Sequence, residues 1–108
     1  MSNSDVTVHN SYNQKKYIMK LFLAGNEPKS QLAKKNLIKI CESYIKEMYY
    51  IEVVDVLKDF QAALKNDVFV TPTLIISNPI PEKVIIGSLS DTQKVIDALG
   101  IDIFDKAL

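Results

Sequence analysis

The sequence predicts an α/β domain with a mixed four-stranded sheet and three helices, in the order β-α-β-α-β-β-α. A near-continuous apolar run at residues 17–23 is typical of a strand buried on both faces. In residues 31–48, apolar side chains recur at the spacing of an amphipathic helix. Thr71-Pro72 then precedes the β-branched run 73–77. Because proline donates no hydrogen bond to a sheet, it is tolerated where a strand begins.

Composition narrows the class of protein. A chain of 108 residues with 47% hydrophobic and 24% charged residues is expected to fold as one soluble domain. Thirteen basic and thirteen acidic residues cancel, which disfavours nucleic acid as a partner. One cysteine and one histidine exclude an internal disulfide and a Cys/His zinc site. Since no apolar run approaches the ~20 residues of a membrane span, we expect a cytoplasmic protein without a membrane partner.

The first half of the chain contains a tail, a strand and a turn. Residues 1–16 are polar and are expected to form a mobile N-terminal tail, so that 17–108 make up the single domain. After the strand at 17–23, Gly25 begins a turn, and Ser30 is predicted to cap the following helix.

The predicted helix over 31–48 places Cys41 near the middle of its apolar face, which indicates a core thiol of low reactivity. A second strand at 50–56 follows, parallel to the first by a right-handed crossover. Asp55 near its end is interpreted as a structural carboxylate that accepts backbone N–H groups.

The second half contains a short helix, a hairpin and a final helix. Asp59 is predicted to cap the short helix, whose inner side would carry Phe60, Ala63 and Leu64. The strand at 73–77 would be joined by a wide turn to an antiparallel strand at 83–86. Ser90 and Gln93 match a capping box for the last helix. Its inner face would carry Val95, Ala98 and Leu99, with Gly100 as its terminator and Ile103 and Phe104 packing back on the body.

This order of elements is the thioredoxin-like arrangement, and it directs attention to the loop after the first strand. In a redox enzyme of that fold, the loop ends in Cys-x-x-Cys at a helix N-terminus. Here residues 24–30 contain no cysteine, and Ser30 has no identifiable histidine partner. We therefore expect no catalytic residues, no metal and no cofactor. An unusual thioredoxin-like enzyme, or a binder of thiol ligands at Thr71-Pro72, is a remote alternative.

Four segments resemble the KaiB family of bacterial clock proteins. They are Leu23-Ala24-Gly25-Asn26-x-Pro28-x-Ser30, Val53-x-Asp55-Val56-Leu57-Lys58, Thr71-Pro72-Thr73-Leu74 and Ile85-Ile86-Gly87-x-Leu89-Ser90-Asp91. They occur in the family's order and spacing, and the similarity extends from Tyr17 to about Leu99.

The resemblance implies a non-enzymatic regulator. KaiB proteins bind the hexameric ATPase KaiC, and in clock systems the complex captures KaiA. Family members can occupy a resting, usually tetrameric form or a thioredoxin-like form that resembles the sensor domain of the histidine kinase SasA. A homo-oligomer, a dimer or a tetramer, is therefore also implied. By this resemblance the partner-binding residues would be Asn26, Lys34, Asp67, Val70, Thr71, Pro72 and Thr73.

Several positions depart from the clock-type pattern. Clock-type members commonly carry an arginine at the position of Leu32, a lysine at Ile76 and another proline at Ile80. A thioredoxin-like signalling adaptor that no longer binds KaiC and has no oscillator role therefore stays open, beside a KaiC-binding clock or stress-adaptation protein. The helix-favouring end Ala98-Leu99-Gly100 predicts rest in the thioredoxin-like form. The residues expected to influence fold state are Pro72, Gly87, Ala98 and Gly100.

Overall fold

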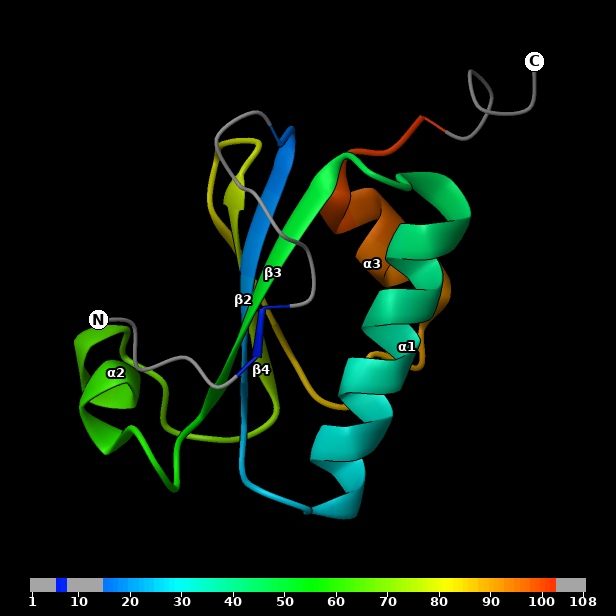
Figure 1. Ribbon diagram of the computed structural model, residues 1–108. Coiled ribbons are helices and arrows are strands. Elements are labelled where there is room, and N and C mark those ends of the chain that lie inside the picture. The colour runs from blue at the N-terminus through cyan, green and yellow to red at the C-terminus, as the bar shows by residue number, and fades with distance from the viewer. Residues whose placement is uncertain (1–5, 8–14, 103–108) are drawn as a thin grey trace.

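The computed structural model describes residues 6–7 and 15–102 (Figure 1). The order of elements predicted from the sequence is confirmed, with one short strand added before it. The elements are β1 Val6–Thr7, β2 Tyr17–Leu23, α1 Pro28–Tyr44, β3 Tyr49–Asp55, α2 Phe60–Lys65, β4 Thr73–Asn78, β5 Lys83–Ile86 and α3 Thr92–Leu99.

The strands form one sheet in the order β1-β3-β2-β4-β5. β2 and β3 are parallel over their whole length, from Tyr17 opposite Tyr49 to Leu23 opposite Asp55. β4 is antiparallel to β2, and β5 is antiparallel to β4. The predicted mixed four-stranded sheet is therefore present. β1, a strand of two residues, pairs with β3 and adds a fifth strand to the sheet.

β1 lies within the segment that we expected to be a mobile tail. Val6 pairs with Val53 and Thr7 with Glu52, antiparallel to β3 at the edge of the sheet. Residues 1–5 and 8–14 lie outside the described part of the chain, as do Ile103 and Phe104. The expectations for those residues stay predictions.

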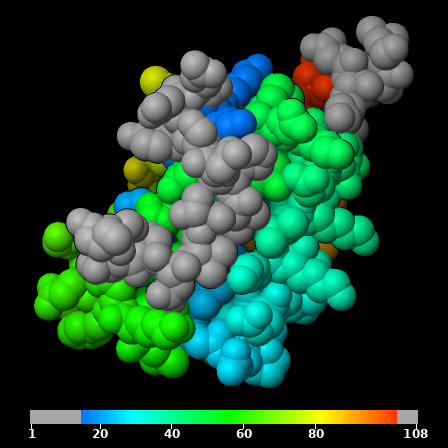
Figure 2. Space-filling model, in the orientation of Figure 1, coloured from blue at the N-terminus to red at the C-terminus, as the bar shows by residue number. Residues whose placement is uncertain are grey.

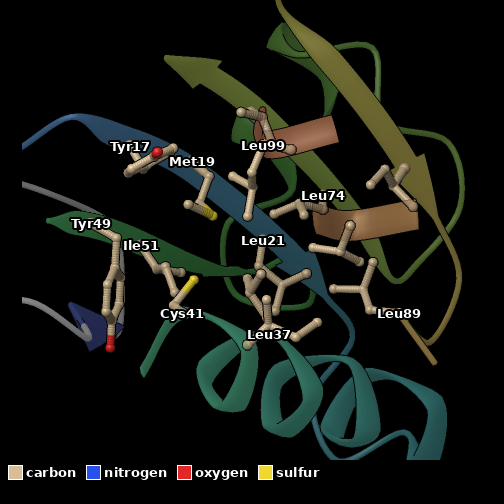
Figure 3. Close-up of a cluster of buried hydrophobic side chains, with 14 of the residues drawn as sticks. Tyr17, Met19, Leu21, Leu37, Cys41, Tyr49, Ile51, Leu74, Leu89 and Leu99 are labelled. Carbon is tan, nitrogen blue, oxygen red and sulfur yellow. The ribbon is translucent and has the colours of Figure 1, made fainter. Parts of the chain in front are cut away.

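The main core lies between the sheet and the two helices α1 and α3, which cover the same face (Figure 1). Alternate residues of β2, β3 and β4 point into it, as the period of two in a strand requires. Figure 3 shows the side chains of Met19, Leu21, Leu37, Cys41, Ile51, Leu74 and Leu99 gathered there. Most of the fold's apolar burial is in this layer.

The other face of the sheet has a smaller core under α2. Its buried members are Phe22, Val54, Ala63, Val68 and Ile75. A helix of six residues covers only part of a sheet face, so β2 is buried on both faces only over Leu21–Leu23. The sequence-based expectation of burial on both faces thus holds for the carboxyl end of the strand alone.

The ends of α1 differ from the prediction. The helix begins at Pro28, not Gln31, because proline suits the first helical position, where its missing N–H has no helical partner anyway. Ser30 is therefore inside the first turn and is not the cap. The helix ends at Tyr44, four residues before Met48, and Met48 is exposed beyond it.

The caps of α2 and α3 confirm one prediction and correct another. Asp59 caps α2 as predicted, accepting the Ala62 N–H at 3.1 Å. α3 is capped by Asp91 through the Lys94 N–H at 3.2 Å, so the predicted capping box at Ser90 was wrong. A carboxylate at this position also interacts favourably with the positive end of the helix dipole. Gly100 ends α3 with φ 73°, as predicted.

The inner face expected for α2 was also wrong. Phe60 and Leu64 are exposed, and Ala63 alone is buried in this helix.

The three peptide bonds before Pro72, Pro79 and Pro81 are cis. No helix in the described ranges is long and apolar enough to cross a membrane.

Candidate partner-binding surface

Two loops meet at the end of the sheet where β2 and β3 finish. One is the turn between β2 and α1, residues 24–27, and the other is the segment 66–72 that leads into β4. The Thr71 hydroxyl donates to Glu27 Oε1 at 3.3 Å and so joins the two loops. Asn26 and Thr71, both predicted to bind a partner, are thereby brought to the same end of the molecule.

The turn after β2 is held by Asp55. Its Oδ1 accepts the backbone N–H of Gly25 and that of Leu57, each at 3.0 Å. This confirms the structural interpretation of Asp55. Gly25 has φ 48°, and a Cβ there would lie 3.1 Å from Leu57 Cδ1, so only glycine fits without adjustment.

Ser30 has a buried bridging role that the sequence did not reveal. Its hydroxyl accepts the Ala24 N–H at 3.1 Å and donates to Glu27 Oε1 at 2.7 Å. The first turn of α1 is therefore fixed to the end of β2. Since Glu27 also accepts from Thr71, one carboxylate connects the helix start with the segment 66–72.

The Thr71-Pro72-Thr73 segment positions its neighbours. Pro72 and Thr73 are buried. Thr73 Oγ1 donates to the Val70 carbonyl at 2.7 Å, and the Pro72 carbonyl accepts the Gly87 N–H at 3.0 Å. In this form Pro72 and Thr73 support the surface on which Val70 is exposed.

The remaining predicted residues lie in different places. Asp67 is exposed and has φ 57°, in the bend that follows α2. Lys34 is half-buried on α1, six residues beyond Pro28, which is about 9 Å along a helix axis. The structure thus gathers Asn26, Val70 and Thr71 near one end, with Lys34 set back along α1.

The most prominent feature near this end is an apolar surface that sequence reasoning missed. Five exposed apolar side chains from α2 and its flanking segments surround a groove of about 310 Å³. We call them the α2 apolar surface: Leu57, Phe60, Leu64, Phe69 and Val70. α2 projects at the lower left of the molecule in Figure 2. The available signal was the density of apolar residues in this stretch, where Leu57, Phe60, Leu64 and the run 68–70 lie close together in the sequence.

The cysteine of the chain does not belong to the α2 apolar surface. Cys41 is buried in the main core, as predicted, and burial, with a smaller effect of the Glu42 charge, raises the pKa of its thiol to about 12. Burial also raises the pKa of Tyr49, whose hydroxyl donates to Glu42 Oε2 at 2.6 Å. Within residues 6–7 and 15–102, no group of three or more His, Cys, Asp or Glu side chains is placed to hold a metal ion.

Comparison with solved structures supports the thioredoxin-like fold. The N-terminal domain of Synechococcus elongatus SasA has a TM-score of 0.66 at 20% identity, covering 86% of this chain and 91% of that domain. Chloroplastic thioredoxin z has a TM-score of 0.69 at 16% identity, covering 82% and 78% of the two chains. At these identities the likeness concerns the fold alone.

Sequence relatives identify the family. The chain is 40% identical over 91 residues to circadian clock protein KaiB3 of Synechocystis sp., covering 84% of this chain and 87% of that protein. It is 43% identical over 90 residues to circadian clock oscillator protein KaiB of Synechococcus elongatus, covering 83% and 86%. The model of the KaiB domain matches residues 20–101. The chain therefore belongs to the KaiB family.

Proposed function

We propose that this chain is a non-enzymatic, cytoplasmic regulator that binds a KaiC-type ATPase in a circadian-clock-related or stress-adaptation pathway. Membership of the family supports a clock-related role. The absence of cysteine from residues 24–30 supports a binding role over thiol exchange, because dithiol chemistry needs a thiolate at that helix start.

The observation that carries the proposal is the α2 apolar surface. It includes Val70 and adjoins Thr71, two of the residues at which the family resemblance places the ATPase contact. Exposed apolar side chains that gather around a groove, with polar residues at its rim, are typical of a protein-binding site. We place Phe69 and Val70 at the centre of the contact, with Asn26 and Asp67 at its rim.

The fixed loop geometry supports the same proposal. Asp55, Ser30 and Glu27 hold the two loops by hydrogen bonds of 2.7–3.3 Å. A surface that is ordered before it meets its partner loses less conformational entropy on binding. Pro72 and Thr73 contribute in this indirect way, by fixing the backbone that presents Val70.

A matched pair of substitutions tests the site. Phe69 and Ile80 are almost equally exposed, at 81% and 82%, but Ile80 lies in the β4–β5 turn away from the α2 groove. We expect Phe69→Ala to weaken binding to the cognate ATPase at least tenfold, as loss of a central aromatic contact does. Ile80→Ala should bind like the wild type. Equal affinity of both variants would overturn the assignment of the site.

One observation favours the alternative of an adaptor that has lost this ATPase. Leu32 is an exposed apolar side chain on α1 where clock-type members carry an arginine. The difference at Ile76 carries no such weight, because Ile76 is fully buried in the main core and so lies on no partner surface in this form. If the genome that encodes this chain also encodes a KaiC but no KaiA, we expect this chain to have a role outside the oscillator.

A further inference from the structure

A small pocket lies between α1 and the start of α3, two helices that lie next to each other on the same face of the sheet (Figure 1). We call it the α1–α3 pocket, and its volume is about 180 Å³. Its lining residues are Asn36, Lys39, Ile40, Ser43, Tyr44 and Thr92. The five from α1 are spaced three or four residues apart, so they share one side of that helix.

The frame of the α1–α3 pocket is held by contacts within the protein. Asn36 donates from Nδ2 to the Ser88 carbonyl at 2.9 Å, which ties α1 to the loop before α3. Ile40 is buried in the main core, and Tyr44 is half-buried against the same core. Because these contacts position the lining before a ligand arrives, binding need not order the site.

The hydroxyl groups of this pocket are unusual for the chain. Residues 15–102 contain eight serine and threonine hydroxyls, and six of them make a hydrogen bond with the protein. The two that make none within the described ranges are Ser43 and Thr92, and both line the α1–α3 pocket. Lys39 and the Tyr44 hydroxyl likewise have no hydrogen-bond or ion-pair partner among the described residues. Four donor side chains are therefore available at one place.

The charge around the pocket is positive. α1 carries four lysines and one acidic residue, although the whole chain is neutral. Lys35 is exposed one turn before Lys39, and none of the six lining residues is acidic. The carboxylates nearest in sequence are already engaged. Glu42 accepts the hydroxyl of Tyr49 at 2.6 Å, and Asp91 accepts a backbone N–H in the first turn of α3 at 3.2 Å.

We propose that the α1–α3 pocket binds a phosphoryl group. Such a group presents three strong acceptor oxygens and close to two negative charges. The ammonium of Lys39 and the hydroxyls of Ser43, Tyr44 and Thr92 supply donors and no competing carboxylate. Sites for drug-sized ligands have volumes of about 300–1,000 Å³, so this smaller pocket suits one phosphoryl group. Inorganic phosphate and a small phosphate monoester are the two sources that the test separates.

This site is separate from the proposed ATPase contact. No lining residue of the α1–α3 pocket lines the groove of the α2 apolar surface. Lys39, Ser43 and Thr92 are exposed, and a site open to solvent predicts weak binding, with a dissociation constant on the order of 1 mM. Loss of phosphate binding should therefore leave ATPase binding unchanged.

Nuclear magnetic resonance titration of the full chain with inorganic phosphate tests the proposal. The ionic strength is held constant with sodium chloride, and the pH is about 8, where phosphate carries close to two charges. We expect saturable chemical-shift changes at the backbone amides of residues 36–44 and of Thr92. Phenyl phosphate is the second probe. Binding of both probes assigns the site to a monoester, whereas binding of inorganic phosphate alone assigns it to the free ion.

Three variants show whether the donors of the pocket are responsible. Lys39→Gln removes the charged donor and should raise the dissociation constant about tenfold. Thr92→Val keeps the size of the side chain but removes its hydroxyl, and should raise the dissociation constant about threefold or more. Lys35→Gln is the matched control, because it removes an exposed lysine of the same helix that does not line the pocket. Its effect should stay below about twofold.

Three results would overturn the proposal: shifts that do not saturate, equal effects of Lys39→Gln and Lys35→Gln, or a Thr92→Val variant that binds like the wild type. Matching thermal unfolding curves show that the comparison concerns binding and not folding. The titration contains no ATPase, so its outcome is distinct from that of the proposed function. A chain that binds the ATPase but not phosphate contradicts this inference alone, and the reverse result contradicts the proposed function alone.

Discussion

Asp55 at the end of β3 accepts, at 3.0 Å, the backbone N–H of Gly25 in the turn that follows β2. These two parallel strands are the centre of the fold, and their carboxyl ends are thereby tied to each other. The same oxygen accepts the Leu57 N–H, so it also fixes the chain leading to α2. A single carboxylate therefore couples the turn before α1 to the segment that begins the α2 apolar surface.

Removal of this carboxylate should destabilise the fold. Asp55→Ala leaves two N–H groups without their acceptor, and we expect the free energy of unfolding to fall by about 2 kcal/mol. Asp55→Asn keeps one acceptor oxygen and should cost less. Urea denaturation of the three proteins checks this order. An alanine variant as stable as the wild type would contradict the role given to Asp55.

Ser30 offers a second test, with a control on the same helix. Ser30→Ala deprives the buried Ala24 N–H of its acceptor and should lower the free energy of unfolding by about 1–3 kcal/mol. Ser43 is exposed on α1, and Ser43→Ala should change stability by less than about 0.5 kcal/mol. The two variants are compared by urea denaturation. If they behaved alike, the bridge from α1 to β2 would contribute nothing.

The raised pKa of Cys41 predicts lower stability at alkaline pH. The thiol of the unfolded chain ionises near pH 9.0, whereas burial keeps it protonated in the folded chain until about pH 12. Over this interval the unfolded chain binds fewer protons, so the free energy of unfolding falls as the pH rises. Tyr49 acts in the same direction.

Unfolding measured from pH 8 to about pH 11 should show this decline, and Cys41→Ala should flatten part of it. In the native protein at pH 8, a thiol reagent should react slowly with Cys41 and rapidly after denaturant is added. Fast labelling of the native protein would show that the thiol is accessible, contrary to its burial.

The end of α3 is where we expect fold state to be sensitive to sequence. Ala98→Gly should lower helix stability by about 0.8–1.0 kcal/mol, and Gly100→Ala by roughly 1–2 kcal/mol, because Gly100 has φ 73°. A Cβ at Gly100 would meet no atom within 4 Å, so its cost is conformational. Chemical shifts should report a helix over Thr92–Leu99 in the wild type. A strand across residues 95–99 would contradict rest in the thioredoxin-like form.

The order of elements, the core position of Cys41 and the role of Asp55 could all be predicted from local pattern. Periodicity identifies strands and helices, and a carboxylate at a strand end commonly meets free N–H groups there. The exposure of Phe60 and Leu64 could not be predicted in this way, because a pattern identifies a helix face but not how much neighbouring surface is available to cover it. This is why the α2 apolar surface was missed.

Two other features depend on contacts between distant segments. The hydrogen bond between Ser30 and Ala24 spans the turn between β2 and α1, a contact that the sequence position of Ser30 does not reveal, and that position suggested a cap instead. β1 is two residues long, and its place is set by the edge of β3 rather than by its own pattern. Among the predicted partner-binding residues, local sequence could not distinguish the buried Pro72 and Thr73 from the exposed Val70.

The proposal of ATPase binding is tested most directly by size-exclusion chromatography of the full chain, alone and mixed with its cognate KaiC hexamer and ATP. We predict that the chain elutes with the hexamer, and that Phe69→Ala reduces the co-eluting fraction while Ile80→Ala retains it. A small free species with no shift at tens of micromolar, in a preparation with the expected helical signal, would contradict the proposal. The family fold would then serve a different partner.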